Sequence, residues 1–180
     1  MDVLSELLAR NAAFAESDRE ELSFIPTLST IVLTCADHRV DPAKVLGLEL
    51  GEAVVLRNGG GRVTPAILLN LGMLATVAAT EGDPDPDRRF ELILMQHTDC
   101  GVSRLAGPEH ADALAAFFGV TPDQVPGKFP DDPHKGIRVD MEALASNPVV
   151  PDALSVTGLV YDVHTGRVEL LERRSPLRES

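Results

Sequence analysis

Two short polar clusters, each placed directly after an apolar run, constrain the fold of this chain most strongly. Cys35-Ala36-Asp37-His38-Arg39 follows the β-branched run Thr30 to Thr34, and His97-Thr98-Asp99-Cys100 follows the apolar run Phe90 to Gln96. A compact apolar run without polar alternation is typical of a strand that is covered on both faces in a parallel sheet. Open α/β sheets gather their ligands at the carboxyl ends of such strands, so the two clusters are expected to meet if the strands are neighbours.

The two clusters contain both cysteines of the chain, and their context favours a metal over a disulfide. The N-terminal sequence has neither the basic region nor the apolar stretch of a secretion signal, so we expect a cytoplasmic location, where disulfides are disfavoured. Two thiolates and one imidazole suit zinc, and three protein ligands leave a fourth position for water or substrate. We therefore predict Cys35, His97 and Cys100 as zinc ligands. The alternative interpretation is two buried cysteines beside a hydrogen-bonded histidine.

Asp37 follows the first cysteine by two residues and can take one of two roles. It can accept a proton from water at the metal, or it can bind the metal as a fourth ligand in a closed state, and the two roles exclude each other. The planar guanidinium of Arg39 can hold the Asp37 carboxylate and keep it ionised, which favours the open metal. We predict Asp37 and Arg39 as catalytic residues; an ordinary loop salt bridge is the alternative.

The charge balance excludes two classes of partner. Lys and Arg number 16 against 28 Asp and Glu, which gives a formal net charge of -12. Such a chain repels nucleic-acid backbones and anionic lipid headgroups. No apolar run approaches the roughly 20 residues that span a bilayer. We therefore expect a small-molecule substrate, with neither nucleic acid nor membrane as a partner.

The order of the predicted elements indicates one α/β domain over residues 1–180. An amphipathic helix from Val3 to Glu16 lies in an N-terminal arm, residues 1–29, which projects from the main domain. Strands alternate with helices over a core, residues 30–171, and this predicts a mostly parallel sheet flanked by helices. The last two apolar runs are expected to form a hairpin, and residues 172–180 to form a polar tail.

The remaining helical segments differ in how clearly the sequence marks them. Pro65 to about Glu81 is apolar nearly all round and is expected to be a buried helix. Ala111 to Phe118 is a second helix, and a third is expected around Asp140 to Ala145. The intervening stretch from Thr121 to Gly136 is crowded with proline, glycine and aspartate, which favours an ordered loop.

Together these motifs resemble those of the β-class carbonic anhydrases. The resemblance spans about Thr30 to Leu171 and includes Cys35-x-Asp37-x-Arg39, Arg57-Asn58-Gly59-Gly60, His97-x-x-Cys100-Gly101 and Gly158-x-Val160-Tyr161-Asp162-x-x-Thr165-Gly166. It implies zinc on the two cysteines and the histidine, an Asp37–Arg39 dyad, and reversible hydration of carbon dioxide to bicarbonate and a proton. It also implies a homodimer or homotetramer, with the N-terminal helix embracing a neighbouring subunit.

Two other functions fit the same residues. The first is hydrolysis of a related small heterocumulene, carbon disulfide or carbonyl sulfide, because that reaction is also an attack by hydroxide on an electrophilic carbon. The second is a non-catalytic zinc-binding or redox-sensing module, in which Asp37 closes the coordination sphere permanently. Turnover of the three gases by the purified zinc protein distinguishes these functions from carbon dioxide hydration.

Overall fold

A computed structural model describes residues 2–17, 21–81, 88–151 and 154–178 of the chain. Within them, one sheet of five strands has the order β2-β1-β3-β4-β5. Its first four strands are parallel, and β5 is antiparallel to β4. The mostly parallel sheet and the terminal hairpin are as predicted. The strands are β1 (Thr30–Cys35), β2 (Ala53–Asn58), β3 (Glu91–His97), β4 (Ser155–Tyr161) and β5 (Val168–Arg174).

The neighbouring positions of β1 and β3 explain how the two polar clusters meet. The strands run parallel in register, with Thr30 opposite Glu91 and Thr34 opposite Met95. Their carboxyl ends therefore lie at the same edge of the sheet. Every residue of β1 is buried, in keeping with its unbroken apolar run.

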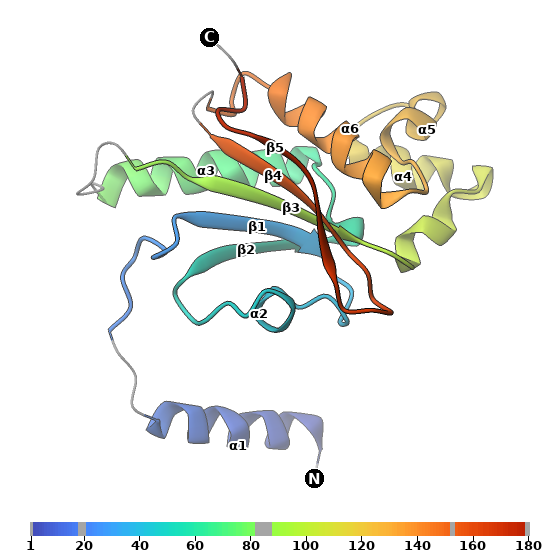
Figure 1. Cartoon of the computed structure of the whole chain (residues 1–180). Coiled ribbons are helices and arrows are strands. Elements are labelled where there is room, and N and C mark those ends of the chain that lie inside the picture. The colour runs from blue at the N-terminus through green and yellow to red at the C-terminus, as the bar shows by residue number, and fades with distance from the viewer. Residues whose placement is uncertain (1, 18–20, 82–87, 152–153, 179–180) are drawn as a thin grey trace.

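Helices α3 and α6 cover the same face of the sheet (Figure 1). Side chains of alternate residues in β1 and β3, among them Leu33 and Leu94, pack with both helices in one apolar core. The helices are α1 (Val3–Glu16), α2 (Pro42–Val45), α3 (Pro65–Glu81), α4 (Ala111–Phe118), α5 (Val125–Lys128) and α6 (Pro133–Ala145), with 3₁₀ turns η1 (Gly59–Gly61), η2 (Gly101–Leu105), η3 (Pro108–His110) and η4 (Pro122–Gln124).

Helix α1 has the predicted bounds and projects from the domain. Figure 1 shows it lying apart from the sheet, and none of its residues is buried. Asp2 caps its N-terminus, because its side chain accepts a hydrogen bond from the Ser5 backbone N–H at 3.0 Å. Its apolar side, which includes Leu4 and Leu8, is consequently exposed.

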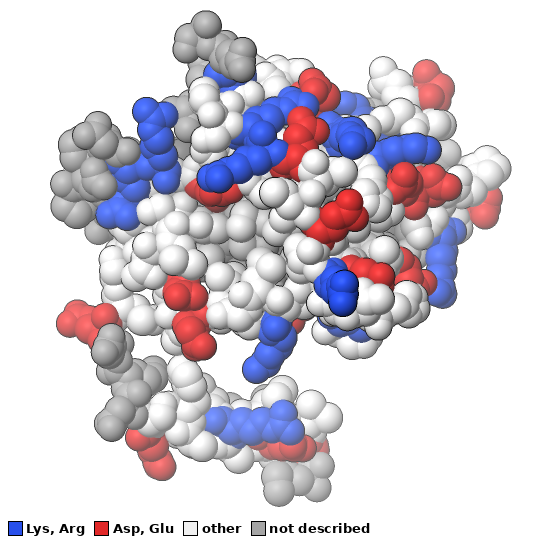
Figure 2. Space-filling model, in the orientation of Figure 1, with Lys and Arg blue, Asp and Glu red and all other residues white. Residues whose placement is uncertain are grey.

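Helix α3 is less buried than its composition predicted. Ile67 and its neighbours toward the sheet are buried or half-buried, whereas Leu69 is 73% exposed and Met73 is 64% exposed. The reason is geometric: the helix packs on the sheet with one side, and its opposite side faces solvent in the single chain. On the face shown in Figure 2, charged side chains gather over the upper part of the domain, whereas the middle of the domain is mostly uncharged.

Two segments differ from the predictions. The stretch predicted as a loop, residues 121–136, contains η4, α5 and the first turn of α6, which begins at Pro133 rather than near Asp140. The predicted polar tail, residues 172–180, continues β5 to Arg174, and Leu177 is buried. Arg174 in this segment forms an ion pair with Glu142 of α6 at 2.7 Å.

Among the described residues, no helix combines the length and the apolar character needed to cross a membrane.

Candidate metal centre

The structure brings together the three predicted metal ligands. Cys35 ends β1, His97 ends β3, and Cys100 directly precedes η2. Their donor atoms all lie within 4.8 Å of one another, and the two sulfur atoms are 3.8 Å apart. Cys35 and His97 are buried and Cys100 is half-buried. The arrangement follows from the parallel pairing of β1 with β3, which places both ligand segments at one sheet edge.

The donor set has the geometry that zinc requires, and the neutral form of His97 offers a free ring nitrogen to the ion. A tetrahedral zinc ion with Zn–S bonds of about 2.3 Å separates its two sulfurs by about 3.8 Å. The Nδ1 atom of His97 donates a hydrogen bond to the Thr98 carbonyl oxygen at 2.8 Å, which leaves Nε2 as the unprotonated nitrogen. That Nε2 atom is buried and has no hydrogen-bond partner among the described residues. The three side chains therefore fit a zinc ion.

The two thiols share one site, and their pKa values shift in opposite directions. Contact with Cys100 is the largest influence that lowers the pKa of Cys35 to about 4, and His97 and two backbone N–H groups add to it against the effect of burial. Contact with Cys35 and burial raise the pKa of Cys100. For His97, burial lowers the pKa, but the neighbouring Cys35 outweighs it and the net shift is upward. A metal cation that binds both sulfurs must displace the remaining thiol proton.

Asp37 binds Arg39, which is one of the two arrangements that the sequence left open. The Arg39 guanidinium donates from Nη2 to Asp37 Oδ2 at 2.7 Å and from Nε to Oδ1 at 3.0 Å. The same Oδ1 atom accepts the Arg39 backbone N–H at 2.9 Å. These hydrogen bonds hold the pKa of Asp37 well below its usual range. His38, between them in sequence, is 93% exposed and lies at the surface.

Asp99 anchors the other side of the same arginine, a role that its sequence position did not reveal. Its Oδ2 atom accepts from Arg39 Nη1 at 2.9 Å, and its backbone carbonyl accepts from Nη2 at 2.9 Å. Asp99 has a φ of 51°, a left-handed conformation that aspartate tolerates better than most residues. Arg39 therefore bridges the two loops that carry the metal ligands.

Arg57 is a further site residue whose role the sequence analysis did not predict. It lies near the end of β2, beside β1, and donates from Nε to the Cys35 carbonyl at 3.0 Å and from Nη2 to the Asp37 carbonyl at 2.7 Å. The guanidinium thus holds the backbone of the first ligand loop. The pairing of β2 with β1 places Arg57 beside this loop. The spacing of residues along the chain therefore does not predict its role.

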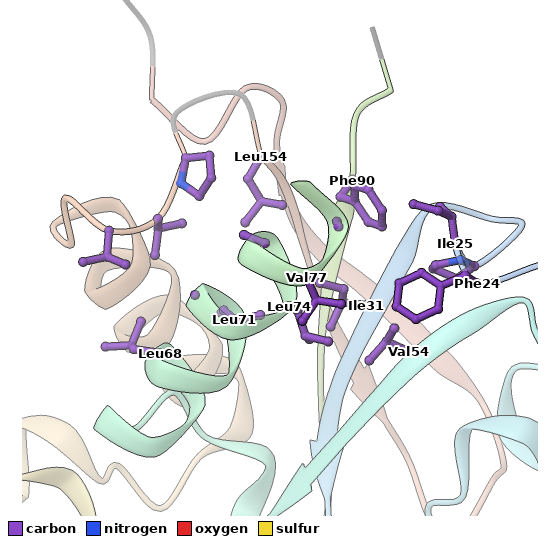
Figure 3. A pocket seen from close by; sticks show the side chains of 17 residues that line it. Phe24, Ile25, Ile31, Val54, Leu68, Leu71, Leu74, Val77, Phe90 and Leu154 are labelled. Atoms are coloured by element: carbon purple, nitrogen blue, oxygen red, sulfur yellow. The ribbon is translucent and has the colours of Figure 1, made fainter. Parts of the chain in front are cut away.

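The structure also has a cavity that lies away from the metal ligands. Figure 3 shows an apolar cavity of about 210 Å³ whose lining includes Phe24 and Ile25 before β1, Leu71 and Leu74 of α3, and Ile31 near the start of β1. None of the described residues that line it is titratable. Because it lies at the amino ends of the strands, it is separate from the ligands at their carboxyl ends.

Comparisons with known proteins agree on one family. A family model described as carbonic anhydrase matches residues 30–116. The β-carbonic anhydrase 1 of Mycobacterium tuberculosis is 30% identical over 168 residues, which cover 93% of this chain and 97% of that protein. A carbon disulfide hydrolase of an Acidianus species is 29% identical over 164 residues, 76% of this chain and 74% of that protein.

A solved structure gives the same result. The carbonic anhydrase of Streptococcus mutans superimposes with a TM-score of 0.73 at 27% identity, covering 96% of this chain and 99% of that one. The strand order, the cysteine–histidine–cysteine cluster and these similarities over nearly the full length lead to one conclusion. The chain belongs to the β-class carbonic anhydrase family.

Proposed function

We propose that this protein is a zinc-dependent carbonic anhydrase that reversibly hydrates carbon dioxide to bicarbonate and a proton. The observation that carries the proposal is the cluster of Cys35, His97 and Cys100, with its unpartnered His97 Nε2, in the same pair of loops as the Asp37–Arg39 pair. The Mycobacterium tuberculosis relative, named as a β-carbonic anhydrase and similar over nearly its whole length, supports the same substrate.

In this proposal Cys35, His97 and Cys100 hold the zinc. Bound zinc supplies Lewis acidity, which makes a water molecule far easier to deprotonate. Two thiolates cancel the charge of the ion, so the effect is weaker than with three neutral histidines and a nearby base is useful. Asp37 is that base, because its carboxylate is ionised at neutral pH and it lies in the same loop as the ligand Cys35. Arg39 also directs the carboxylate, and Asp99 fixes Arg39 in turn.

Hydrolysis of carbon disulfide is the second candidate function. Proteins named as carbon disulfide hydrolases match this chain at 29% and 25% identity, close to the 30% of the named carbonic anhydrase. The same proton acceptor and the same ligand set serve that reaction, since its first step is also the attack of hydroxide on a linear, electrophilic carbon.

Parallel assays on one zinc-loaded preparation test these functions. Stopped-flow measurements compare the hydration of carbon dioxide with the hydrolysis of carbon disulfide and of carbonyl sulfide over a series of pH values. We expect carbon dioxide to have the highest kcat/KM. A higher value for carbon disulfide would instead establish the second candidate. No turnover of any gas, with zinc fully bound at every pH, would leave only a non-catalytic zinc module.

Two substitutions separate the proposed proton acceptor from the proposed ligands. Asp37→Ala should retain zinc and lower kcat/KM by about 10²- to 10⁴-fold, the usual contribution of a general base. Cys100→Ala should lose zinc itself. Metal analysis and stopped-flow assays of both variants check this, with His110→Ala in the turn η3 as the control, because His110 pairs with Glu109 and, among the described residues, with none of the site residues. Equal metal loss in the Asp37 and Cys100 variants would contradict the assigned roles.

We also propose that the protein assembles as a homodimer or homotetramer in which α1 packs on a neighbouring copy. None of the residues of α1 is buried, its leucines Leu4 and Leu8 are exposed, and α3 exposes Leu69 and Met73. Two exposed apolar surfaces on one chain fit a symmetric contact between copies. The cytoplasmic location stays a prediction from the sequence.

A further inference from the structure

We infer that Asp140 of α6, acting through Arg62 and Gln96, positions the two segments that carry the metal ligands. Helix α6 supplies none of those ligands. The inference rests on the proposed function only in that the site holds zinc, and it concerns how tightly the site holds the ion rather than which gas is turned over.

Asp140 is the centre of a fully buried polar network. Its Oδ2 atom accepts from Arg62 Nε at 2.7 Å and from Gln96 Nε2 at 2.8 Å, and its Oδ1 atom accepts from Arg62 Nη2 at 3.1 Å. The side chains of Arg62 and Asp140 are only 3% and 2% exposed. The rings of Phe118 and Phe129 lie 5.3 Å and 5.8 Å from the guanidinium carbon. This two-pronged ion pair in an apolar setting fixes Arg62 in one position.

The first arm of the network leads to Cys35. Arg62 directly follows the turn η1, which is closed by reciprocal hydrogen bonds: the Arg62 backbone N–H donates to Asn58 Oδ1, and Asn58 Nδ2 donates to the Arg62 carbonyl, both at 2.8 Å. Inside that turn, the Gly60 N–H donates to the sulfur of Cys35 at 3.3 Å. Asp140 therefore helps to set the direction of a hydrogen bond to a metal ligand.

The second arm leads to His97. Gln96, the preceding residue of β3, is 5% exposed and donates its side-chain amide to Asp140. Helix α6 also packs closely on this amide at Gly136, where a Cβ atom would come within 2.3 Å of Gln96 Oε1. The carboxamide is thus held between a hydrogen bond and a tight backbone contact, and these hold the end of β3 from which His97 projects.

The positioning role can be separated from a role in stability. Replacing a buried ion pair by apolar residues of similar volume is often neutral for stability, whereas removing one partner alone leaves a buried charge. A double replacement, Arg62→Met with Asp140→Leu, should therefore still pack between the two phenylalanine rings. Among the described residues, it would remove the hydrogen bonds of Asp140 with Arg62 and Gln96, together with the one from Arg62 Nη2 to the Lys128 carbonyl.

Zinc affinity is the measurement that tests this inference. The zinc dissociation constant is measured by competition with a chromophoric chelator, and the cobalt-substituted protein reports ligand geometry through its visible absorption. We expect the double variant to bind zinc about 10- to 100-fold more weakly, the usual cost of losing groups that orient metal ligands. Gln96→Met, which cuts only the second arm, should weaken binding less. The control is Met141→Leu, a volume-conserving change at a buried α6 position outside the network.

Each outcome decides the inference. A folded double variant with the zinc affinity and cobalt spectrum of the wild type would overturn it, and urea unfolding of the metal-free proteins shows whether the variant is folded. If the double variant does not fold, Gln96→Met decides: weaker zinc binding supports the inference and unchanged binding overturns it. If the wild-type protein binds zinc tightly but turns over no gas, the proposed function is wrong. The comparison of zinc affinities between the wild type and the variants would still test the role of Asp140.

Discussion

Gly61 shows how closely the backbone packs around the first metal ligand at the scale of single residues. It has a φ of +63°, a conformation in which side chains are strained, and a Cβ atom there would lie 2.8 Å from the Cys35 backbone nitrogen. Real Cβ atoms do not approach that closely, so β1 would have to move. The turn and the strand that end at the metal centre therefore depend on a residue without a side chain.

Gly61→Ala should destabilise the protein more than Gly166→Ala. Gly166 has a similar φ of +69° but no heavy atom within 4 Å of the position of a Cβ, so only the backbone strain of about 1–2 kcal/mol applies there. Gly61→Ala adds the clash with β1, and we expect a larger loss in the free energy of unfolding together with weaker zinc binding. Urea titrations and zinc competition assays compare the variants. Equal losses at the two glycines would show that the close approach has no energetic consequence.

Residue identity allowed the metal ligands to be predicted, but not the residues that support them. Cysteine and histidine after two apolar runs are a strong signal, because few other roles require them there. Asp99, Arg57 and Asp140 give no such signal, since aspartate and arginine are ordinary surface residues. Their roles arise from the pairing of strands and from the packing of α6. Neither can be predicted from the spacing of residues along the chain.

At the scale of elements, the strands and the long helices could be predicted and the start of α6 could not. Unbroken apolar runs identify buried parallel strands directly. Pro133 and Gly136 indicate a loop by local rules, yet Pro133 occupies the first turn of α6 and Gly136 allows that helix to lie against Gln96. Gly136 thus allows two elements that are distant in sequence to pack together. Local propensity cannot predict such a contact.

The start of α6 also carries a pH-dependent link to β5. His134 lies between Glu169, at 3.2 Å from Nε2, and Asp132, at 3.1 Å from Nδ1. The hydrogen bond with Glu169 is the largest influence that raises the pKa of His134, and Asp132 adds to it. A histidine whose pKa is raised on folding stabilises the protein fully below its unfolded pKa, and this stabilisation is lost as the pH rises through the folded pKa.

His134→Gln should therefore matter more in acid than in base. We expect the variant to be less stable than the wild type near pH ~6 and nearly equal to it near pH ~9. The difference should stay below about 1 kcal/mol, because the His134 side chain is 38% exposed and solvent screens the pair. Urea unfolding at several pH values checks this. A difference that is constant with pH would show that the ring contributes by packing and not by charge.

At the scale of the whole molecule, the metal centre, the apolar cavity and α1 occupy separate regions. The metal ligands lie at the carboxyl ends of the strands, and the cavity shown in Figure 3 lies at their amino ends. Helix α1 stands apart from the sheet, as Figure 1 shows, and its leucines Leu4, Leu7 and Leu8 are exposed. A single copy thus leaves apolar surface that assembly would remove from water, which is the physical reason to expect an oligomer.

The assembly prediction is tested on α1. Leu4→Glu with Leu8→Glu places two charges on the apolar side of the helix, and we expect the dissociation constant between copies to rise by about 100-fold or more, given the value of burying each leucine. Sedimentation velocity measures the change in size. Arg10→Ala, on an exposed side chain that pairs with Glu6 of the same helix, is the control. Unchanged size in the double variant would place the contact between copies elsewhere.

The most direct test of the metal centre is the zinc K-edge X-ray absorption spectrum of the purified protein. The predicted result is one zinc ion per chain with two sulfur ligands at about 2.3 Å and two nitrogen or oxygen ligands at about 2.0–2.1 Å, of which one is His97. Folded protein that binds no zinc, or zinc with one sulfur or none, would contradict the ligand set of Cys35, His97 and Cys100.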